Sequence, residues 1–247
     1  MKAPASIGLC RDEKHNYFWD GAGPLPSPTT IVRVLAAGWA LENWRIEQRV
    51  RIAIRDAHLL AEMRDRGETD AAVKYVMSTK EDRSALDRGS AVHEWAEKFN
   101  RGELTDAPPA LAAECAGYVE WAQATQPEWL LVEEMVANLE YGYAGTLDGL
   151  ARIDGENWLL DIKTSKSVEY RGKVNDDYRL QLAAYGNAEF WGRPNDPEQH
   201  PMPKVDRYGI VHVTPTGTRL VDAKVTRSDW LAFLQALSLH NWKREAA

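Results

Sequence analysis

The chain has 247 residues, of which 44% are hydrophobic and 27% are charged, and its formal net charge at pH 7 is −7. These values are typical of a globular protein with one large domain, or a core with a helical appendage. No apolar run is long enough to cross a bilayer and residues 1–16 lack an apolar signal stretch, so we expect a cytoplasmic protein without a membrane partner. Two distant cysteines exclude a disulfide framework and a four-cysteine cluster. The acidic balance does not exclude a nucleic-acid partner, because steering of phosphate needs only a local positive patch.

Proline and glycine interrupt residues 1–28, which we expect to be loop-like. The first half of the chain then shows helical periodicity. Helices are predicted over residues 29–37, 40–64, 69–77, 80–100 and 108–126. The second of them carries Arg45, Arg49, Arg51 and Arg55. These arginines form either a solvated face beside acidic residues or a patch that contacts phosphates.

The composition changes near residue 128, where β-branched and other apolar residues alternate with turn signals. Strands are predicted over residues 128–139, 145–153, 158–164, 205–214 and 218–226, with helices over 177–191 and 228–244. This order predicts a mixed α/β (α+β) fold with a helical N-terminal half. We therefore divide the chain into a loop-like segment 1–28, a helical region 29–127 and a mixed region 128–247.

One predicted hairpin brings together charged residues that could bind a metal or take part in catalysis. Asp154-Gly155 is a preferred two-residue hairpin turn, and it places Ile153 opposite Glu156. The same register places Asp148 opposite Asp161, with Cβ atoms about 5 Å apart. Lys163 is two residues beyond Asp161, so it lies on the same face.

Two like charges that face each other destabilise a sheet, so something must offset the repulsion between Asp148 and Asp161. A divalent cation with Lys163 beside it would do so, and oxygen ligands at this separation suit Mg²⁺ or Mn²⁺. Gly145 and Gly149 indicate close approach of a ligand or another backbone. The alternative is a surface hairpin whose acids are solvated or paired with lysine and arginine.

Four short motifs occur in a fixed order over residues 85–190. They are Gly89-Ser90-Ala91-Val92-His93-Glu94, Gly145-Thr146-Leu147-Asp148-Gly149, Asp161-Ile162-Lys163-Thr164 and Gln181-Leu182-Ala183-Ala184-Tyr185. The set resembles the PD-(D/E)xK nuclease superfamily, most closely its RecB-like branch. That branch includes nuclease domains of bacterial recombination helicases, CRISPR adaptation nucleases and stand-alone phage exonucleases. Ser27-Pro28-Thr29-Thr30 and the long helical lead-in also look like the phage-type members.

The resemblance implies a restriction-endonuclease-like core, in which a mixed central sheet is flanked by helices, over residues 128–247. It implies catalytic roles for Asp148, Asp161 and Lys163, and metal ligation by His93, both aspartates and the carbonyl of Ile162. It also places Gln181 and Tyr185 near the DNA. A further acid on the preceding strand is either Glu133 or Glu134.

The sequence departs from the family in two places. Leu147 stands where a proline usually precedes the first aspartate, and the cysteines that bind an iron–sulfur cluster in several relatives are missing. The expected cofactor is therefore one or two Mg²⁺ or Mn²⁺ ions without a cluster. Basic and polar residues near the motifs are candidate phosphate contacts. They are Arg88, Ser165, Lys166, Arg171, Lys173 and Arg179, with Lys166 favoured because it follows the catalytic strand.

The implied activity is metal-dependent hydrolysis of DNA, by an exonuclease that acts on ends in recombination, repair or phage DNA processing, where partner proteins of those processes are expected. Three alternatives stay open: a non-catalytic DNA-binding or assembly module, a structure-specific endonuclease, and a hydrolase of small phosphate esters. The intact Asp148, Asp161 and Lys163 argue against a degenerate module. The sequence leaves polarity, strand preference and oligomeric state open.

Overall fold

A computed structural model describes residues 8–35, 39–79, 84–103, 106–165, 167–194 and 196–246. The chain divides into two compact units, one of Met1–Val34 with Gly89–Ala247 and the other of Leu35–Arg88. The division therefore falls inside the expected helical region 29–127. Each unit is described by itself. Among the described residues, no helix is both long enough and apolar enough to cross a membrane.

The larger unit is built around a mixed five-stranded sheet in the order β14-β13-β8-β7-β4. These strands are β4 (Glu128–Val132), β7 (Gly149–Ile153), β8 (Glu156–Lys163), β13 (Arg207–Thr214) and β14 (Gly217–Asp222). β13 runs parallel to β8, and the other neighbours are antiparallel. The mixed α/β class predicted from the sequence is thus confirmed.

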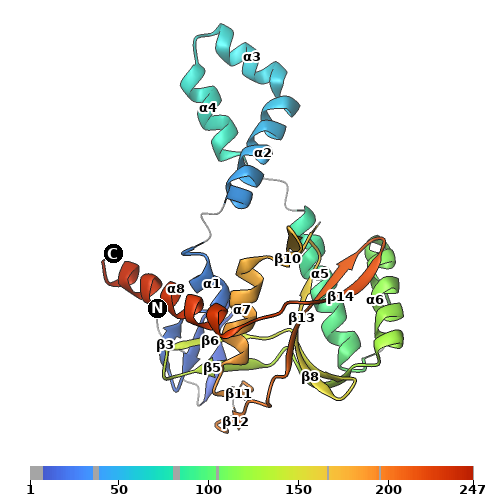
Figure 1. The fold of residues 1–247 in the computed structure, drawn as a ribbon. Coiled ribbons are helices and arrows are strands. Elements are labelled where there is room, and N and C mark those ends of the chain that lie inside the picture. The colour runs from blue at the N-terminus through green and yellow to red at the C-terminus, as the bar shows by residue number, and fades with distance from the viewer. Residues whose placement is uncertain are drawn as a thin grey trace. The chain divides into compact units, whose positions relative to one another are not determined.

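Helices cover both faces of this sheet (Figure 1). α5 (Ser84–Asn100) and α6 (Ala112–Thr125), which follows a 3₁₀ turn at Pro109–Leu111, contribute Val92, Trp95, Tyr118 and Trp121 to the core on one face. α7 (Asp176–Gly186) packs Leu182 and Tyr185 against the other face. α1 (Pro28–Val32) and α8 (Arg227–Glu245) share a further apolar cluster with α7. The ends of the central strands therefore lie between two helical layers.

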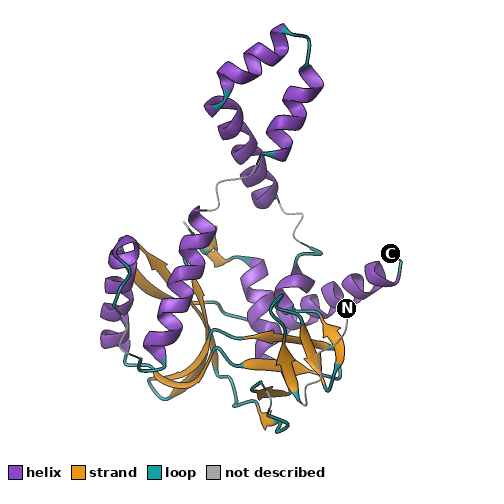
Figure 2. Cartoon of the chain, turned by 180° about the vertical axis from the view of Figure 1, so that it is seen from behind, coloured by secondary structure: helices purple, strands orange, loops and turns teal. Residues whose placement is uncertain are grey.

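A second sheet has four strands in the order β12-β11-β5-β6. Figure 2 shows the strands of the larger unit in orange, seen from behind. They are β5 (Met135–Asn138), β6 (Tyr143–Thr146), β11 (Phe190–Gly192) and β12 (His200–Pro201). The prediction of one strand over 128–139 is wrong, because Glu133 adopts a positive φ of 50° and the chain turns from β4 into β5. The helix predicted over 177–191 ends at Gly186, since Phe190–Gly192 pairs with β5 instead.

The expectation of a loop-like N-terminus is wrong for the described residues. A three-stranded antiparallel sheet is formed by β1 (Leu9–Arg11), β2 (Tyr17–Trp19) and β3 (Ala22–Leu25). Its apolar residues Leu9 and Tyr17 are buried against Met135, Ala144 and Phe190 of the second sheet. This burial makes such short strands stable. A further two-stranded hairpin comprises β9 (Glu169–Tyr170) and β10 (Lys173–Val174).

The smaller unit contains α2 (Trp39–Arg55), α3 (Ala57–Asp65) and α4 (Thr69–Ser78). The single helix predicted over 40–64 breaks at Asp56, whose carboxylate accepts hydrogen bonds from the Arg55 side chain and the Tyr75 hydroxyl. Arg49 donates to main-chain carbonyls of α4 and its C-terminal end, and Arg51 pairs with Glu47. These partners favour the structural interpretation of the arginine-rich helix over the phosphate-contacting one.

Candidate metal centre

The hairpin predicted from Asp154-Gly155 is present with the predicted register. Ile153 pairs with Glu156, and the ladder continues to Gly149 opposite Leu160. Both turn residues have positive φ, 51° at Asp154 and 83° at Gly155, as a two-residue turn of this class requires. The local turn chemistry therefore sets which residues of β7 and β8 face each other.

Asp148 lies one residue before β7, at a bend where the ladder with β8 has ended. The expectation that it opposes Asp161 within the ladder is therefore wrong in detail. Its carboxylate instead crosses to β8 and accepts a hydrogen bond of 2.7 Å from the main-chain N–H of Ile162. Asp148 and Asp161 still lie close enough for the Asp148 charge to raise the pKa of Asp161.

Asp161 and Lys163 form a buried ion pair at the end of β8. The Lys163 Nζ lies 2.7 Å from Oδ1 and 2.6 Å from Oδ2 of Asp161. Burial is the main cause that raises the pKa of Asp161, against the lowering effect of Lys163. Burial pulls the pKa of Lys163 down, but the carboxylates of Asp161 and Asp148 raise it above its usual value overall. Lys163 is therefore a fixed cation, and its Nζ also lies 5.2 Å from the ring centroid of Tyr178.

His93 reaches the same place from α5. Its Nδ1 lies 3.4 Å from Oδ2 of Asp148, and the side chain is 29% exposed. Gly89, one turn earlier, explains the close approach of the helix, since a Cβ there would lie 2.9 Å from the Thr164 hydroxyl oxygen at the end of β8. A bulkier residue at position 89 would push the histidine away from the strand ends.

The structure distinguishes between the two glutamates that the sequence left open. Glu134 is paired with Arg193, with contacts of 2.9 and 3.0 Å to one carboxylate oxygen. Glu133 has the positive φ noted above, and its main-chain N–H donates to the carbonyl of Asp148. Burial, followed by the charges of Asp148 and Glu97, raises the pKa of Glu133 to about 8. Glu133 is therefore the additional acid of the site.

His93, Glu133 and Asp148 each offer a ligand atom, and these atoms all lie within 4.8 Å of one another. Two carboxylates and one imidazole are a donor set that fits Mn²⁺, and with less preference Mg²⁺, which favours oxygen ligands. Asp161 adds a third carboxylate beside this set, and its oxygens contact the Lys163 ammonium. The residues present thus fit a divalent cation. The Ile162 carbonyl stays a predicted ligand.

Gln181 and Tyr185 lie one turn apart on α7, and the Gln181 side-chain amide donates to the Tyr185 hydroxyl at 3.4 Å. Burial raises the pKa of Tyr185, with smaller effects from Tyr17, Asp148 and Asp161. Gly145 faces Tyr185, because a Cβ there would lie 2.7 Å from its ring. Gly149 similarly makes room for the Trp129 ring. Both glycines thus accommodate side chains, which corrects the expectation of a ligand or another backbone.

The candidate phosphate contacts lie in different parts of the structure. Ser165 lies two residues after the end of β8, where its carbonyl is 2.7 Å from the buried His212 ring nitrogen Nε2. Lys166 lies outside the described residues. Arg179 bonds to Asp229, which ties α7 to α8 and favours a structural role. Arg88 belongs to the other compact unit, and Arg171 and Lys173 are exposed beside the β9–β10 turn.

No protein-family model matches this chain, and the comparison with curated proteins found no match. The resemblance described above therefore rests on four short motifs and their order.

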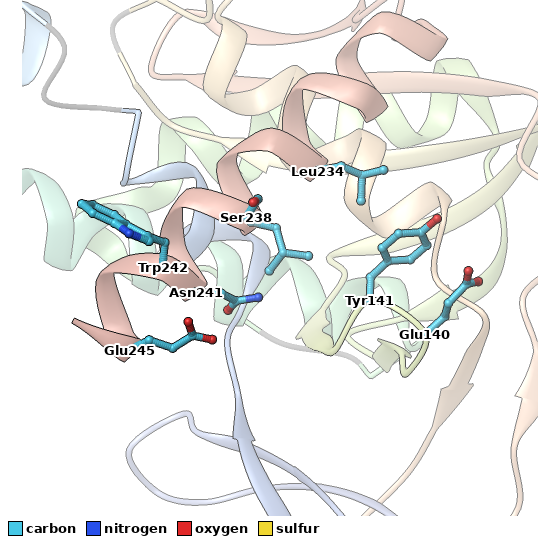
Figure 3. Close-up of a pocket in the computed structure, with 8 residues that line it drawn as sticks. Glu140, Tyr141, Leu234, Ser238, Asn241, Trp242 and Glu245 are labelled. Atoms are coloured by element: carbon cyan, nitrogen blue, oxygen red, sulfur yellow. The ribbon is translucent and has the colours of Figure 1, made fainter. Parts of the chain in front are cut away.

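A groove elsewhere on the larger unit has a volume of about 480 Å³ and lies between the β5–β6 turn and α8 (Figure 3). Its lining includes Tyr141, Leu234 and Trp242 and none of the residues of the metal centre. The chemistry-bearing cluster is thus at the strand ends and not in this groove.

Sequence reasoning missed two side chains that the N-terminal strands bring close to the metal centre, Arg11 and Tyr17. A signal was present. Apolar or aromatic residues at 9–10 and 17–19 flank a polar stretch at 11–16, which is typical of a hairpin.

Proposed function

We propose that this chain is a metal-dependent DNA nuclease of the PD-(D/E)xK type, acting as an exonuclease on DNA ends. The observation that supports it best is the convergence of His93, Glu133 and Asp148 next to the buried Asp161–Lys163 pair. Three carboxylates, an imidazole and a fixed ammonium in one place can bind a divalent cation and stabilise negative charge on a phosphate, which suits metal-dependent phosphodiester hydrolysis. The motif resemblance supports DNA as substrate and action on ends.

Glu133, Asp148 and His93 would hold Mg²⁺ or Mn²⁺, with Asp161 close by. The bound ion would supply a Lewis acid that polarises the phosphodiester and acidifies water. Asp161 also holds the Lys163 ammonium, through contacts of 2.6 and 2.7 Å. Its buried carboxylate balances that charge and limits where Nζ can lie.

Lys163 contributes a positive charge and does not act as a base, because the neighbouring carboxylates raise its pKa and keep it protonated. Its ammonium stabilises the negative charge that grows on the phosphate oxygens as the water oxygen forms a bond to phosphorus. The bond from phosphorus to the leaving oxygen breaks, that oxygen takes up a proton, and the proton of the attacking water passes to solvent. Lys163 also orients the water by donating a hydrogen bond.

The test is incubation of linear and covalently closed circular DNA with Mg²⁺ or Mn²⁺. We expect loss of the linear DNA alone, and at least about a hundredfold slower loss with Lys163→Ala. Lys204→Ala is the matched control, because this lysine is 85% exposed and pairs only with Asp206 among the described residues.

Nicking of the circle would replace the exonuclease proposal with an endonuclease. If neither DNA is cleaved with either metal and the wild type behaves like Lys163→Ala, the nuclease proposal is wrong.

A further inference from the structure

Two side chains of the N-terminal hairpin converge on one threonine of the second sheet. Arg11 and Tyr17 are direct cross-strand partners of β1 and β2, so they point from the same face of the hairpin. The Tyr17 hydroxyl lies 2.9 Å from Oγ1 of Thr146, and Nη1 of Arg11 donates to the same atom at 3.3 Å. The hairpin is thereby attached to the end of β6 through two polar contacts.

Thr146 is two residues before Asp148, on a segment that runs beside the one that carries Glu133. Thr146 pairs with Met135, the Leu147 N–H donates to the Glu134 carbonyl, and the Glu133 N–H donates to the Asp148 carbonyl. Arg11 is therefore held at the edge of the candidate metal centre.

Arg11 differs from the other arginine near this edge. Arg101 donates to the Val132 carbonyl and forms an ion pair of 3.0 Å with Glu97. Arg11 is exposed, and no carboxylate of the described residues lies within ion-pair distance of it. A guanidinium has five donors in a planar fork, and one contact with a threonine leaves most of them available.

A divalent cation would neutralise much of the carboxylate charge next to Arg11, and the arginine would then add a net positive charge beside the centre. Phosphate oxygens are the natural partner of such a group, since arginine binds them through paired hydrogen bonds. The Arg11 guanidinium is exposed, so such a phosphate can reach it from solvent.

We propose that Arg11 is a phosphate-binding residue that holds a DNA backbone phosphate next to the one being cleaved. The inference rests on the proposed nuclease function, and it assigns a substrate contact to a strand that precedes the four motifs by more than 70 residues.

The experiment measures binding of a short fluorescein-labelled DNA by anisotropy at several salt concentrations, with Ca²⁺ in place of Mg²⁺ so that the carboxylates are neutralised by a cation that also takes oxygen ligands. We expect Arg11→Gln to weaken binding about five- to tenfold and to lower the slope of log affinity against log salt by roughly 0.7 to 0.9, the loss of one phosphate contact. Arg11→Lys should restore most of the slope. Arg152→Gln is the control, because Arg152 is exposed and paired with Glu128.

A second measurement separates phosphate binding from simple charge balance at Glu133. Calorimetric titration with Mn²⁺ should show Arg11→Gln binding the metal at least as tightly as the wild type, since a nearby positive charge has been removed. If Arg11→Gln matches the wild type in affinity and salt slope while the wild type cleaves DNA, this inference is wrong and the nuclease proposal stands. If the wild type neither binds nor cleaves DNA, both are wrong.

Discussion

The carboxylate of Asp148 accepts a 2.7 Å hydrogen bond from the main-chain N–H of Ile162, across the point where the β7–β8 ladder ends. This contact replaces the ladder bond that the bend at Asp148 removes. It holds one acid beside Asp161 and directs it toward His93 and Glu133. The Asp148 side chain thus bonds to β8 at the end of the β7–β8 ladder and also forms part of the candidate metal centre.

Asp148→Asn should separate these two roles. The amide oxygen can still accept the Ile162 N–H, and the loss of a negative charge removes repulsion with Glu133 and Asp161. We expect the free energy of unfolding in EDTA to be unchanged or higher, and cleavage to fall at least about a hundredfold. Asp148→Ala should be less stable than the asparagine variant by about 1–3 kcal/mol, because it leaves the Ile162 N–H without its acceptor. Urea denaturation measures both; equal stability of the two variants would contradict the anchoring role.

Lys163→Met should destabilise the fold in a pH-dependent way. Removing one partner of a buried ion pair costs about 3–5 kcal/mol, because the remaining charge is uncompensated. Without Lys163 the pKa of Asp161, already raised by burial, rises further. A carboxyl group with a raised pKa in the folded state favours folding at low pH and loses that contribution as the pH rises through the folded-state value.

Urea denaturation across the pH range should therefore show the largest loss for Lys163→Met above neutral pH. The double variant Asp161→Asn with Lys163→Met removes both charges and should recover much of the stability without activity. A stability loss independent of pH, or no recovery in the double variant, would argue against a coupled charge pair.

The raised pKa of Glu133 predicts how the stability of the metal-free protein changes with pH. Burial raises its pKa from 4.5 to about 8, so its protonated form favours folding below pH 4.5 and this contribution is lost as the pH rises toward about 8. In EDTA, the melting temperature of the wild type should fall over this range more than that of Glu133→Gln. Added Mn²⁺ should reverse the trend at high pH, because it binds the ionised form. Parallel curves for wild type and Glu133→Gln would show that the carboxyl group ionises normally.

The imidazole of His93 predicts which of two metal ions the candidate metal centre binds more tightly. An imidazole ligand suits transition metals better than Mg²⁺, so the set of His93, Glu133 and Asp148 should bind Mn²⁺ more tightly than Mg²⁺. We expect His93→Ala to weaken Mn²⁺ binding by at least about tenfold, and Mg²⁺ binding by less. Titration calorimetry measures both affinities, with His240→Ala as a control outside the centre. An unchanged Mn²⁺ affinity in His93→Ala would remove the histidine from the ligand set.

The sequence alone determined the features that depend on a few neighbouring residues. Asp154-Gly155 specified the turn, and the turn specified the β7–β8 register, because two successive positive φ values leave a hairpin little other choice. The alternation along β8 placed Lys163 on the face of Asp161. The sequence likewise predicted a helix over residues 80–100, and the structure has α5 over Ser84–Asn100.

The tertiary structure decided which distant segments meet. The break in the strand at Glu133 places Glu133, and not Glu134, beside the candidate metal centre. The bend at Asp148 takes this residue out of the β7–β8 ladder. Both features depend on pairing with strands whose positions are not specified by sequence periodicity. Arg11 lies at the edge of the candidate metal centre because β1 and β2 bury their apolar side chains on the second sheet. The pattern of residues 9–19 is typical of a hairpin, but it does not specify the sheet on which the hairpin packs, and that packing involves residues more than 100 positions away.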